Sequence, residues 1–167
     1  MCLDRLAKFT VDENARGEAW AWKVFVVRPD GNECLPCLSC TKKIDYDKWL
    51  NERTYRDISF IAGLDGMYSV GMTGKEHDGY YLSSAWRLYT EKADKEYRAG
   101  FHCFLSQRDA AWWGRRLGCT NGFKSIIRRI LTRRIVAQGI EKGRRVIVAK
   151  EIYISSEHDL NKEAHNV

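Results

Sequence analysis

The pattern of apolar and polar positions predicts a strand near each end of the chain. Residues 19–27, AWAWKVFVV, are dominated by aromatic and β-branched side chains, and residues 29–32, PDGN, have the composition of a turn. Residues 143–155, GRRVIVAKEIYIS, give the clearest strand pattern. Apolar residues occur on both of its sides, as with Val146 beside Ile147, which is typical of a strand in the centre of a sheet.

The stretch 100–113, GFHCFLSQRDAAWW, predicts a short strand followed closely by a helix. Ser106 is suited to cap the helix, because its hydroxyl can accept a hydrogen bond from a backbone N–H of the first turn. Asp109, three residues later, places a carboxylate near the positive end of the helix dipole. We therefore expect a helix from about residue 107 to 117, ended by Gly118.

Several segments between these elements keep more than one interpretation. Residues 33–43, which include a proline, favour an edge strand or a loop, and residues 44–58 favour a short helix. Five glycines between residues 62 and 79 indicate a hairpin or a loop, and residues 80–91 fit either a strand followed by a loop or a helix. Residues 124–135 have apolar side chains at helical spacing, but their Ile and Val content favours a strand.

Together these elements predict an α+β fold, with a mainly antiparallel sheet and one or two packed helices. The chain has 167 residues, of which 44% are apolar, so it can bury a core without disulfides or metals. We expect a single domain over residues 1–155, with a glycine-rich variable segment at about 62–80 and a polar tail at 156–167. No stretch approaches the roughly 20 apolar residues that span a bilayer, which favours a cytoplasmic protein without a membrane partner.

The cysteines raise a separate question, because Cys34, Cys37 and Cys40 have the spacing C-x2-C-x2-C. Thiolates two residues apart can bind one Zn²⁺, and similar spacing occurs in iron–sulfur sites. Structural zinc sites more often take two ligand pairs from distant parts of the chain, whereas these cysteines are crowded together. In a cytoplasmic protein we expect free thiols and neither a metal nor another cofactor, with zinc as the alternative.

Positive charge is concentrated late in the chain. The net charge of the whole chain is +6, yet residues 115–150 contain eleven Lys or Arg side chains and a single carboxylate, Glu141. Such a surface would attract a phosphate backbone or an acidic protein groove, whereas the alternative is a solvated charged face without a partner. The candidate binding residues are Arg115, Arg116, Arg128, Arg129, Arg133, Arg134 and Trp112.

The disposition of these side chains depends on the local structure. If residues 124–135 form a helix, the four arginines between 128 and 134 cover one side of it; if they form a strand, each adjacent pair splits between two faces. Trp112 and Trp113 cannot point in the same direction on a helix, so one of them is expected near the surface, where tryptophan often anchors a protein interface. The tryptophans could also stack bases beside the arginines, although core positions are more usual.

The C-terminal half resembles a domain that is common in phage and prophage proteins. The resemblance is carried by residues 100–113, by VAQG at 136–139 and by VIVAKEIYI at 146–154, and the opening MCL followed by WKVF at 22–25 is similar to other small phage proteins. It implies a compact α+β unit from mobile genetic elements, without an agreed activity. Small phage accessory proteins, including anti-CRISPRs, often bind and block host machinery. By analogy with that class, we expect a protein that binds and inhibits a host or defence protein complex, including nucleoproteins, with nucleic acid as a second partner class.

His102, in the Gly-Phe-His sequence, has two interpretations. An imidazole at a strand end could act as a general base, or it could hold the strand-to-helix corner through hydrogen bonds alone. The region is also loosely similar to the NAD-binding core of ADP-ribosyltransferases, which implies a role for Glu151 on the last strand. That family has a His or Arg on its first strand, which AWKVFVV at 21–27 does not offer. The structural role is therefore favoured, and no catalytic residue is expected.

Overall fold

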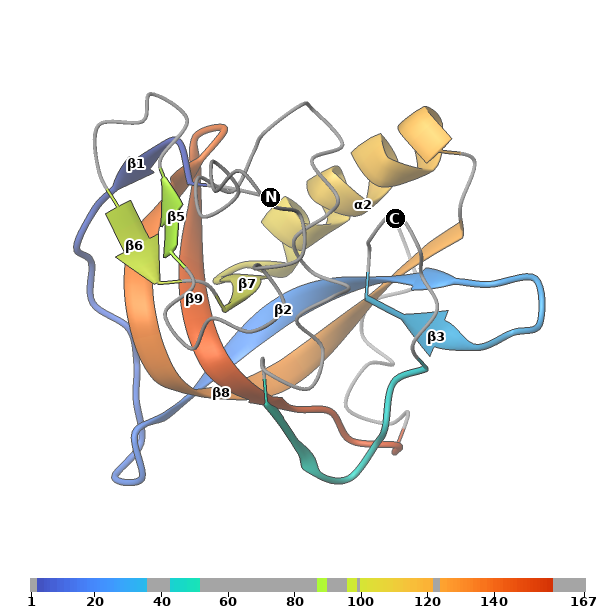
Figure 1. Ribbon diagram of the computed structural model, residues 1–167, viewed down its shortest axis with the longest axis horizontal. Coiled ribbons are helices and arrows are strands. Elements are labelled where there is room, and N and C mark those ends of the chain that lie inside the picture. The colour runs from blue at the N-terminus through green and yellow to red at the C-terminus, as the bar shows by residue number, and fades with distance from the viewer. Residues whose placement is uncertain are drawn as a thin grey trace, which may run out of the picture.

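The computed structural model describes residues 3–35, 43–51, 87–89, 96–98, 100–121 and 124–157, and it confirms an α+β fold dominated by antiparallel strands (Figure 1). The elements, in chain order, are β1 (Arg5–Leu6), β2 (Glu18–Val27), β3 (Glu33–Cys34), β4 (Trp49–Asn51), β5 (Arg87–Tyr89), β6 (Glu96–Arg98), β7 (Phe101–Phe104), α2 (Gln107–Asn121), β8 (Lys124–Glu141) and β9 (Arg144–Tyr153). The strands predicted at the two ends of the chain correspond to β2 and β9.

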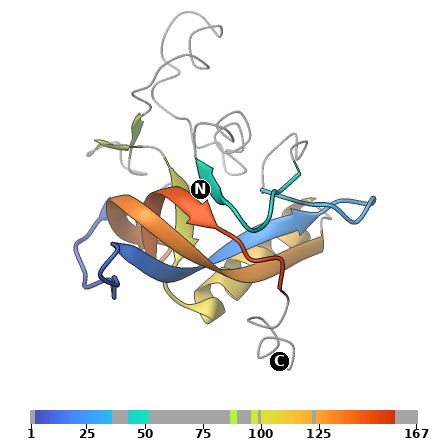
Figure 2. The same ribbon diagram turned by 90° about the horizontal axis from the view of Figure 1, so that it is seen from below.

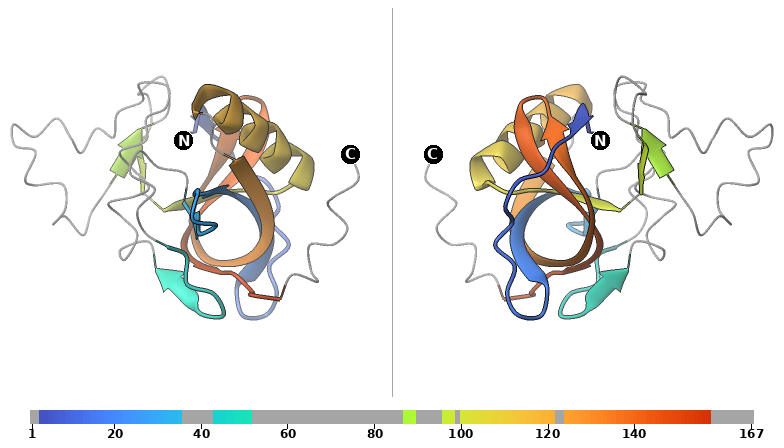
Figure 3. Two further views of the ribbon diagram at one scale, coloured as in Figure 1. Left: turned by 90° about the vertical axis from the view of Figure 1, so that its right-hand side faces the viewer. Right: turned by 90° about the vertical axis from the view of Figure 1, so that its left-hand side faces the viewer.

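Four of the strands close into a small antiparallel barrel. β8 pairs with β2 between residues 124 and 133 and with β9 between residues 131 and 141, while β7 pairs with both β2 and β9. The hydrogen-bonded ring therefore runs through β2, β7, β9 and β8, and Figure 3 shows these strands curving around a common axis. β1, β3 and β4 pair at its margins, and β5 and β6 form a separate two-stranded sheet.

β8 resolves the two interpretations of residues 124–135 in favour of a strand. Ile and Val side chains suit a pleated, half-buried surface, and here they face a partner strand on each side. Ile130 lies opposite Ala21 on β2, and Ile135 lies opposite Ala149 on β9. The register shifts just after Ile135, as in a β-bulge, which bends a strand and increases its twist. β8 therefore runs beside β2 and then curves over to β9 (Figure 2).

Tight turns connect the neighbouring strands. Lys142 and Gly143 join β8 to β9 with φ values of 47° and 79°, as a two-residue type I′ hairpin requires. Between β2 and β3, Gly31 has a φ of 78°, and its N–H donates to the carbonyl oxygen of Arg28 at 2.9 Å. The turn predicted at residues 29–32 is confirmed, and of the segment 33–43 the first two residues form an edge strand that pairs with β2, while residues 36–42 lie outside the described residues.

α2 begins where the sequence predicts and ends later. The Oγ atom of Ser106 accepts a hydrogen bond from the backbone N–H of Asp109 at 3.2 Å, which confirms Ser106 as the N-cap. The expected end at Gly118 is wrong, because the helix continues to Asn121. A glycine ends a helix by adopting a left-handed conformation, whereas Gly118 keeps the helical one at a propensity cost of about 1 kcal/mol.

The hydrophobic core occupies both surfaces of the barrel wall. One cluster contains Phe25 of β2, Phe101 of β7 and Ile147 of β9. The second lies between the barrel and α2, where Trp113 packs with Val24 and other apolar residues of β2, β7 and β9. α2 therefore covers one side of the barrel, and β4 lies on the opposite side (Figures 1 and 3).

The helix expected over residues 44–58 is wrong for its described part. Residues 49–51 form β4, and Leu50 is buried while its two neighbours are half-buried, which is the period-two pattern of a strand. Leu50 lies opposite Ile152 of β9, so tertiary pairing outweighs the weak local preference for a helix. Residues 52–58 and the glycine-rich segment at 62–79 lie outside the described residues.

Candidate binding face

One face of the sheet carries two neighbouring cross-strand rows of side chains. Residues directly opposite each other in antiparallel strands share a face, and so do residues two apart in one strand. By the register of β2, β8, β9 and β4, one row is formed by Trp20, Leu131, Tyr153 and Trp49. The adjacent row is formed by Glu18, Arg133, Glu151 and Asn51. We call them the aromatic row and the polar row, and with Arg129 and Arg134 they form the arginine–aromatic face.

Guanidinium groups lie over both tryptophans of the aromatic row. The Cζ atom of Arg129 is 4.5 Å from the centre of the Trp20 ring, and that of Arg133 is 4.0 Å from the centre of the Trp49 ring. Both distances fall within the range of cation–π attraction, which contributes about 0.5–1 kcal/mol at exposed sites. Tyr153 extends the row, with its ring centre 5.8 Å from that of Trp49. These contacts restrict the orientation of the rings before any partner binds.

Trp20 is the large apolar side chain that remains exposed in the part of the chain that the structure describes, with 43% of its surface accessible. The same strand continues beneath α2, where Val24 is buried in the second core cluster. Exposure of an indole forgoes the free energy that burial of its apolar surface would provide, about 25 cal/mol per Å². Such a residue is typical of a binding surface.

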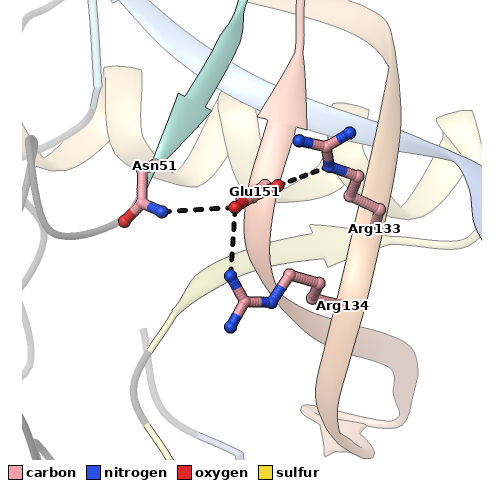
Figure 4. A network of polar contacts seen from close by, with 4 residues as sticks. All are labelled: Asn51, Arg133, Arg134 and Glu151. Atoms are coloured by element: carbon pink, nitrogen blue, oxygen red, sulfur yellow. Dashed lines mark hydrogen bonds and ion pairs between the residues drawn. The ribbon is translucent and has the colours of Figure 1, made fainter.

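Glu151 is the centre of the polar row (Figure 4). Its Oε2 atom accepts a hydrogen bond from Nε of Arg133, and its Oε1 atom lies 3.2 Å from Nη1 of Arg134 and 3.3 Å from Nδ2 of Asn51. Burial opposes ionisation of this carboxyl, but the two guanidinium groups outweigh burial and lower its pKa below the usual value. Glu151 is therefore an ionised carboxylate that orients two arginines at neutral pH.

Arg128 does not belong to this face. Its side chain is buried, and it binds both carboxylate oxygens of Glu33, with Nε 2.6 Å from Oε2. The ring of Tyr46 lies 5.4 Å from its Cζ atom. Arg129, the next residue, is exposed on the opposite side of β8, so this pair splits between two faces as expected for a strand. Arg128 therefore has a structural environment and is not available as a surface contact.

The remaining predicted binding residues lie on α2, apart from both the arginine–aromatic face and Arg128. Arg115 and Arg116 are exposed on the helix. Trp113 is buried, while Trp112 is half-buried beneath the guanidinium groups of Arg144 and Arg116, whose Cζ atoms are 3.5 and 5.8 Å from its ring centre. Of the seven candidate binding residues, the structure therefore places Arg129, Arg133 and Arg134 together, buries Arg128 and puts the other three on α2.

His102 lies in the core. Its Nε2 atom is 3.1 Å from the hydroxyl oxygen of Tyr97, which also accepts a hydrogen bond from the backbone N–H of Leu3 at 3.0 Å. Burial lowers the pKa of His102 well below its usual value, and the positive charge of Lys23 lowers it further. The imidazole is therefore neutral in the folded protein. No described contact joins it to Glu151, the second residue of the enzymatic alternative.

The cysteine hypothesis is addressed by the structure for one residue only. Cys34 is buried, and its Sγ atom lies 3.7 Å from the carbonyl oxygen of Val26. Cys37 and Cys40 lie outside the described residues. Among the residues that are described, no group of three or more His, Cys, Asp or Glu side chains could hold a metal ion. Free thiols therefore stay the prediction for these three cysteines, with zinc binding as the alternative.

Comparison of the chain with models of protein families, with curated proteins and with solved structures gives no match. Within the described residues, no helix has the length and apolar composition needed to cross a membrane.

Sequence reasoning found the arginines of the face and missed the residues that organise them. Sequence reasoning considered the tryptophans, Trp49 among them, beside the arginines, but it did not pair them. Tyr153, Asn51 and the arginine-binding role of Glu151 depend on which residues of β4, β8 and β9 lie opposite each other. The one available signal was the alternation in AWAWKVFVV, which places Trp20 two residues from Trp22 on one side of a strand.

Proposed function

We propose that this protein acts by binding, and that the arginine–aromatic face is its contact surface for a host or defence protein complex in the cytoplasm of a phage host. The observation that carries the proposal is the exposure of Trp20 beside the stacked guanidinium of Arg129. Tryptophan and arginine are the residue types most enriched among the anchors of protein interfaces. The resemblance to small phage proteins supports a host or defence complex as the target.

The order already present in the free protein favours tight binding. Glu151 holds Arg133, and Arg133 in turn lies over the ring of Trp49. Ordering a long side chain at an interface costs about 0.5–1.5 kcal/mol, and here part of that cost is incurred when the chain folds. More of the contact energy therefore contributes to affinity.

The charge of the face favours an acidic partner. Three arginines and two glutamates, Glu18 and Glu151, belong to it, which leaves a small positive excess. The side chain of Arg134 is 66% exposed and can contact a partner while it stays bound to Glu151. Complementary charge of this kind improves specificity and the rate of association. An acidic protein surface or a phosphate-bearing nucleoprotein fits this pattern.

The state of the titratable residues supports binding over catalysis. His102 is buried and neutral, and its ring nitrogen contacts Tyr97. Glu151 is ionised and bound by two arginines and Asn51, so proton transfer would first have to disrupt these contacts. Neither residue has the arrangement that a general base requires.

The proposal is tested by affinity capture from a bacterial host, with each recovered complex identified and assayed for inhibition. We expect Trp20→Ala combined with Arg129→Ala to lose capture and inhibition. The matched control combines Trp112→Ala with Arg116→Ala, a stacked tryptophan and arginine on α2, and it should retain both. Equal recovery by the two double variants, or failure of the natural protein to inhibit any complex that it captures, would overturn the proposal.

A further inference from the structure

We infer that the arginine–aromatic face binds a single-stranded segment of nucleic acid. This inference rests on the proposed function, because it uses the same face and names the component of a nucleoprotein partner that would lie on it. Its basis is the arrangement of the aromatic and polar rows across β2, β8, β9 and β4.

The aromatic row has the form of a stacking platform. Adjacent strands are about 4.8 Å apart, so the four side chains from Trp20 to Trp49 extend over a distance on the order of 14 Å. Trp20 stands at one end of the row, and Trp49 and Tyr153 stand together at the other, with Leu131 between them. Unpaired bases stack on aromatic side chains displayed on a sheet, and every base has a face that suits such a contact.

The arginines are placed for the phosphates of such a strand. Arg129 lies over the ring of Trp20 at one end of the face, and Arg134 is largely exposed beside Glu151. A guanidinium that stacks on an aromatic ring through its flat surface still directs its N–H groups outward in the plane of the group. Where a guanidinium covers a ring, a base can stack on the outer surface of the guanidinium plane, as bases do on arginine in RNA recognition, while the in-plane N–H groups contact phosphate.

The polar row favours a single strand over a duplex. Glu18 lies beside Arg133 in the polar row, and its carboxylate would repel the dense phosphates of a duplex laid across the face. Glu151 is buried and its charge is compensated by two arginines. A single strand can place its bases over the aromatic row and its phosphates at the arginines.

The inference is tested with the full chain by fluorescence anisotropy, using labelled 12-nucleotide single strands of RNA and of DNA with one sequence, and the corresponding DNA duplex. We expect a single strand to bind at least tenfold more tightly than the duplex. Trp20→Ala should weaken binding about tenfold, Trp20→Phe should restore part of the loss, and Trp112→Ala should change it less than twofold. Circular dichroism checks that each variant is folded, which the exposed position of Trp20 favours.

Preference for the duplex, absence of single-strand binding, or equal affinity of the natural protein and Trp20→Ala would overturn the inference. The comparison with affinity capture separates it from the proposed function. If no oligonucleotide binds but capture and inhibition of a host complex still depend on Trp20 and Arg129, only the nucleic acid is excluded. If single strands bind through Trp20 but no host complex is captured and inhibited, the nucleic-acid site stands and the inhibitory function fails.

Discussion

Arg133 and Arg134 are consecutive residues of β8, yet their guanidinium groups both bind the carboxylate of Glu151. Successive side chains of a regular strand point to opposite faces of the sheet. Arg134 has a φ of 57°, in the left-handed region, and the register between β8 and β9 shifts just beyond it. This local distortion brings two positive charges to one carboxylate. A non-glycine residue held in this region is often found at a functional site.

The backbone conformation of Arg134 predicts an unusual order of stability for two substitutions. Arg134→Gly and Arg134→Ala both remove the ion pair with Glu151, but only glycine adopts a φ of 57° without steric cost. We expect the glycine variant to be more stable by about 1 kcal/mol in the free energy of unfolding, measured by urea denaturation. At Arg133 the order should reverse. Equal stability of the two Arg134 variants would argue against the left-handed conformation.

Adjacent arginines on opposite faces of β8 predict very different effects of one substitution. Arg128→Ala leaves the carboxylate of Glu33 without its buried partner, and we expect the free energy of unfolding to fall by about 3 kcal/mol. Arg129→Ala, the matched control, removes an exposed stack on Trp20 and should cost less than about 1 kcal/mol. Chemical denaturation of both variants measures the difference. Similar losses would show that the two side chains are not divided between interior and surface.

The parts of the fold that sequence predicts are those decided by local pattern. β2 and β9 have runs of β-branched and aromatic residues, and the corner at Ser106 has its own capping signal. The sequence of β8 does not distinguish a helix from a strand, because its isoleucines fit the repeat of either one. Its pairing with β2 and β9 makes it a strand. β4 has three residues, so its strand conformation depends on β9 rather than on its own composition.

The sequence predicts the positive charge of the candidate site but not which side chains contact each other there. Arg129, Arg133 and Arg134 could be identified as cations from their neighbours in sequence. Their stacking partners come from β2 and β4, and the choice of partner depends on a register that no local pattern encodes. A shift of one residue would place Trp20 on the other face. Burial of Arg128 also depends on Glu33, which is far away in sequence.

Glu141 predicts a pH dependence of stability. Burial raises the pKa of its carboxyl to about 8, with Asp4 adding to the increase and Lys23 opposing it. The unfolded chain releases this proton near the ordinary value of 4.5, whereas the folded protein keeps it up to about pH 8. The resulting stabilisation is complete below pH 4.5 and is lost as the pH rises through 8.

Glu141→Gln isolates this effect, because glutamine has a similar shape and does not titrate. The difference in the free energy of unfolding between the natural protein and this variant should decrease with increasing pH by up to about 1.4 kcal/mol per pH unit. Urea denaturation at a series of pH values between 5 and 9, on the order of one unit apart, measures the difference. A difference that does not change over this range would show that Glu141 is ionised in the folded protein.

Gly100, the first residue of the Gly-Phe-His sequence, is required by packing. A Cβ atom at this position would lie 2.6 Å from the carbonyl oxygen of Ala149 and 3.0 Å from a methyl carbon of Val148, because β7 approaches β9 closely there. We expect Gly100→Ala to lower the free energy of unfolding by about 2–3 kcal/mol, since the contact with backbone cannot be relieved by a side-chain rotation.

Gly31→Ala is the control, because a Cβ atom there meets open space and only the φ of 78° is unfavourable, at a cost of about 1 kcal/mol. Thermal or urea denaturation of the two variants measures the difference in their stability losses. If Gly100→Ala is no more destabilising than Gly31→Ala, glycine at this position serves something other than the close approach of the two strands.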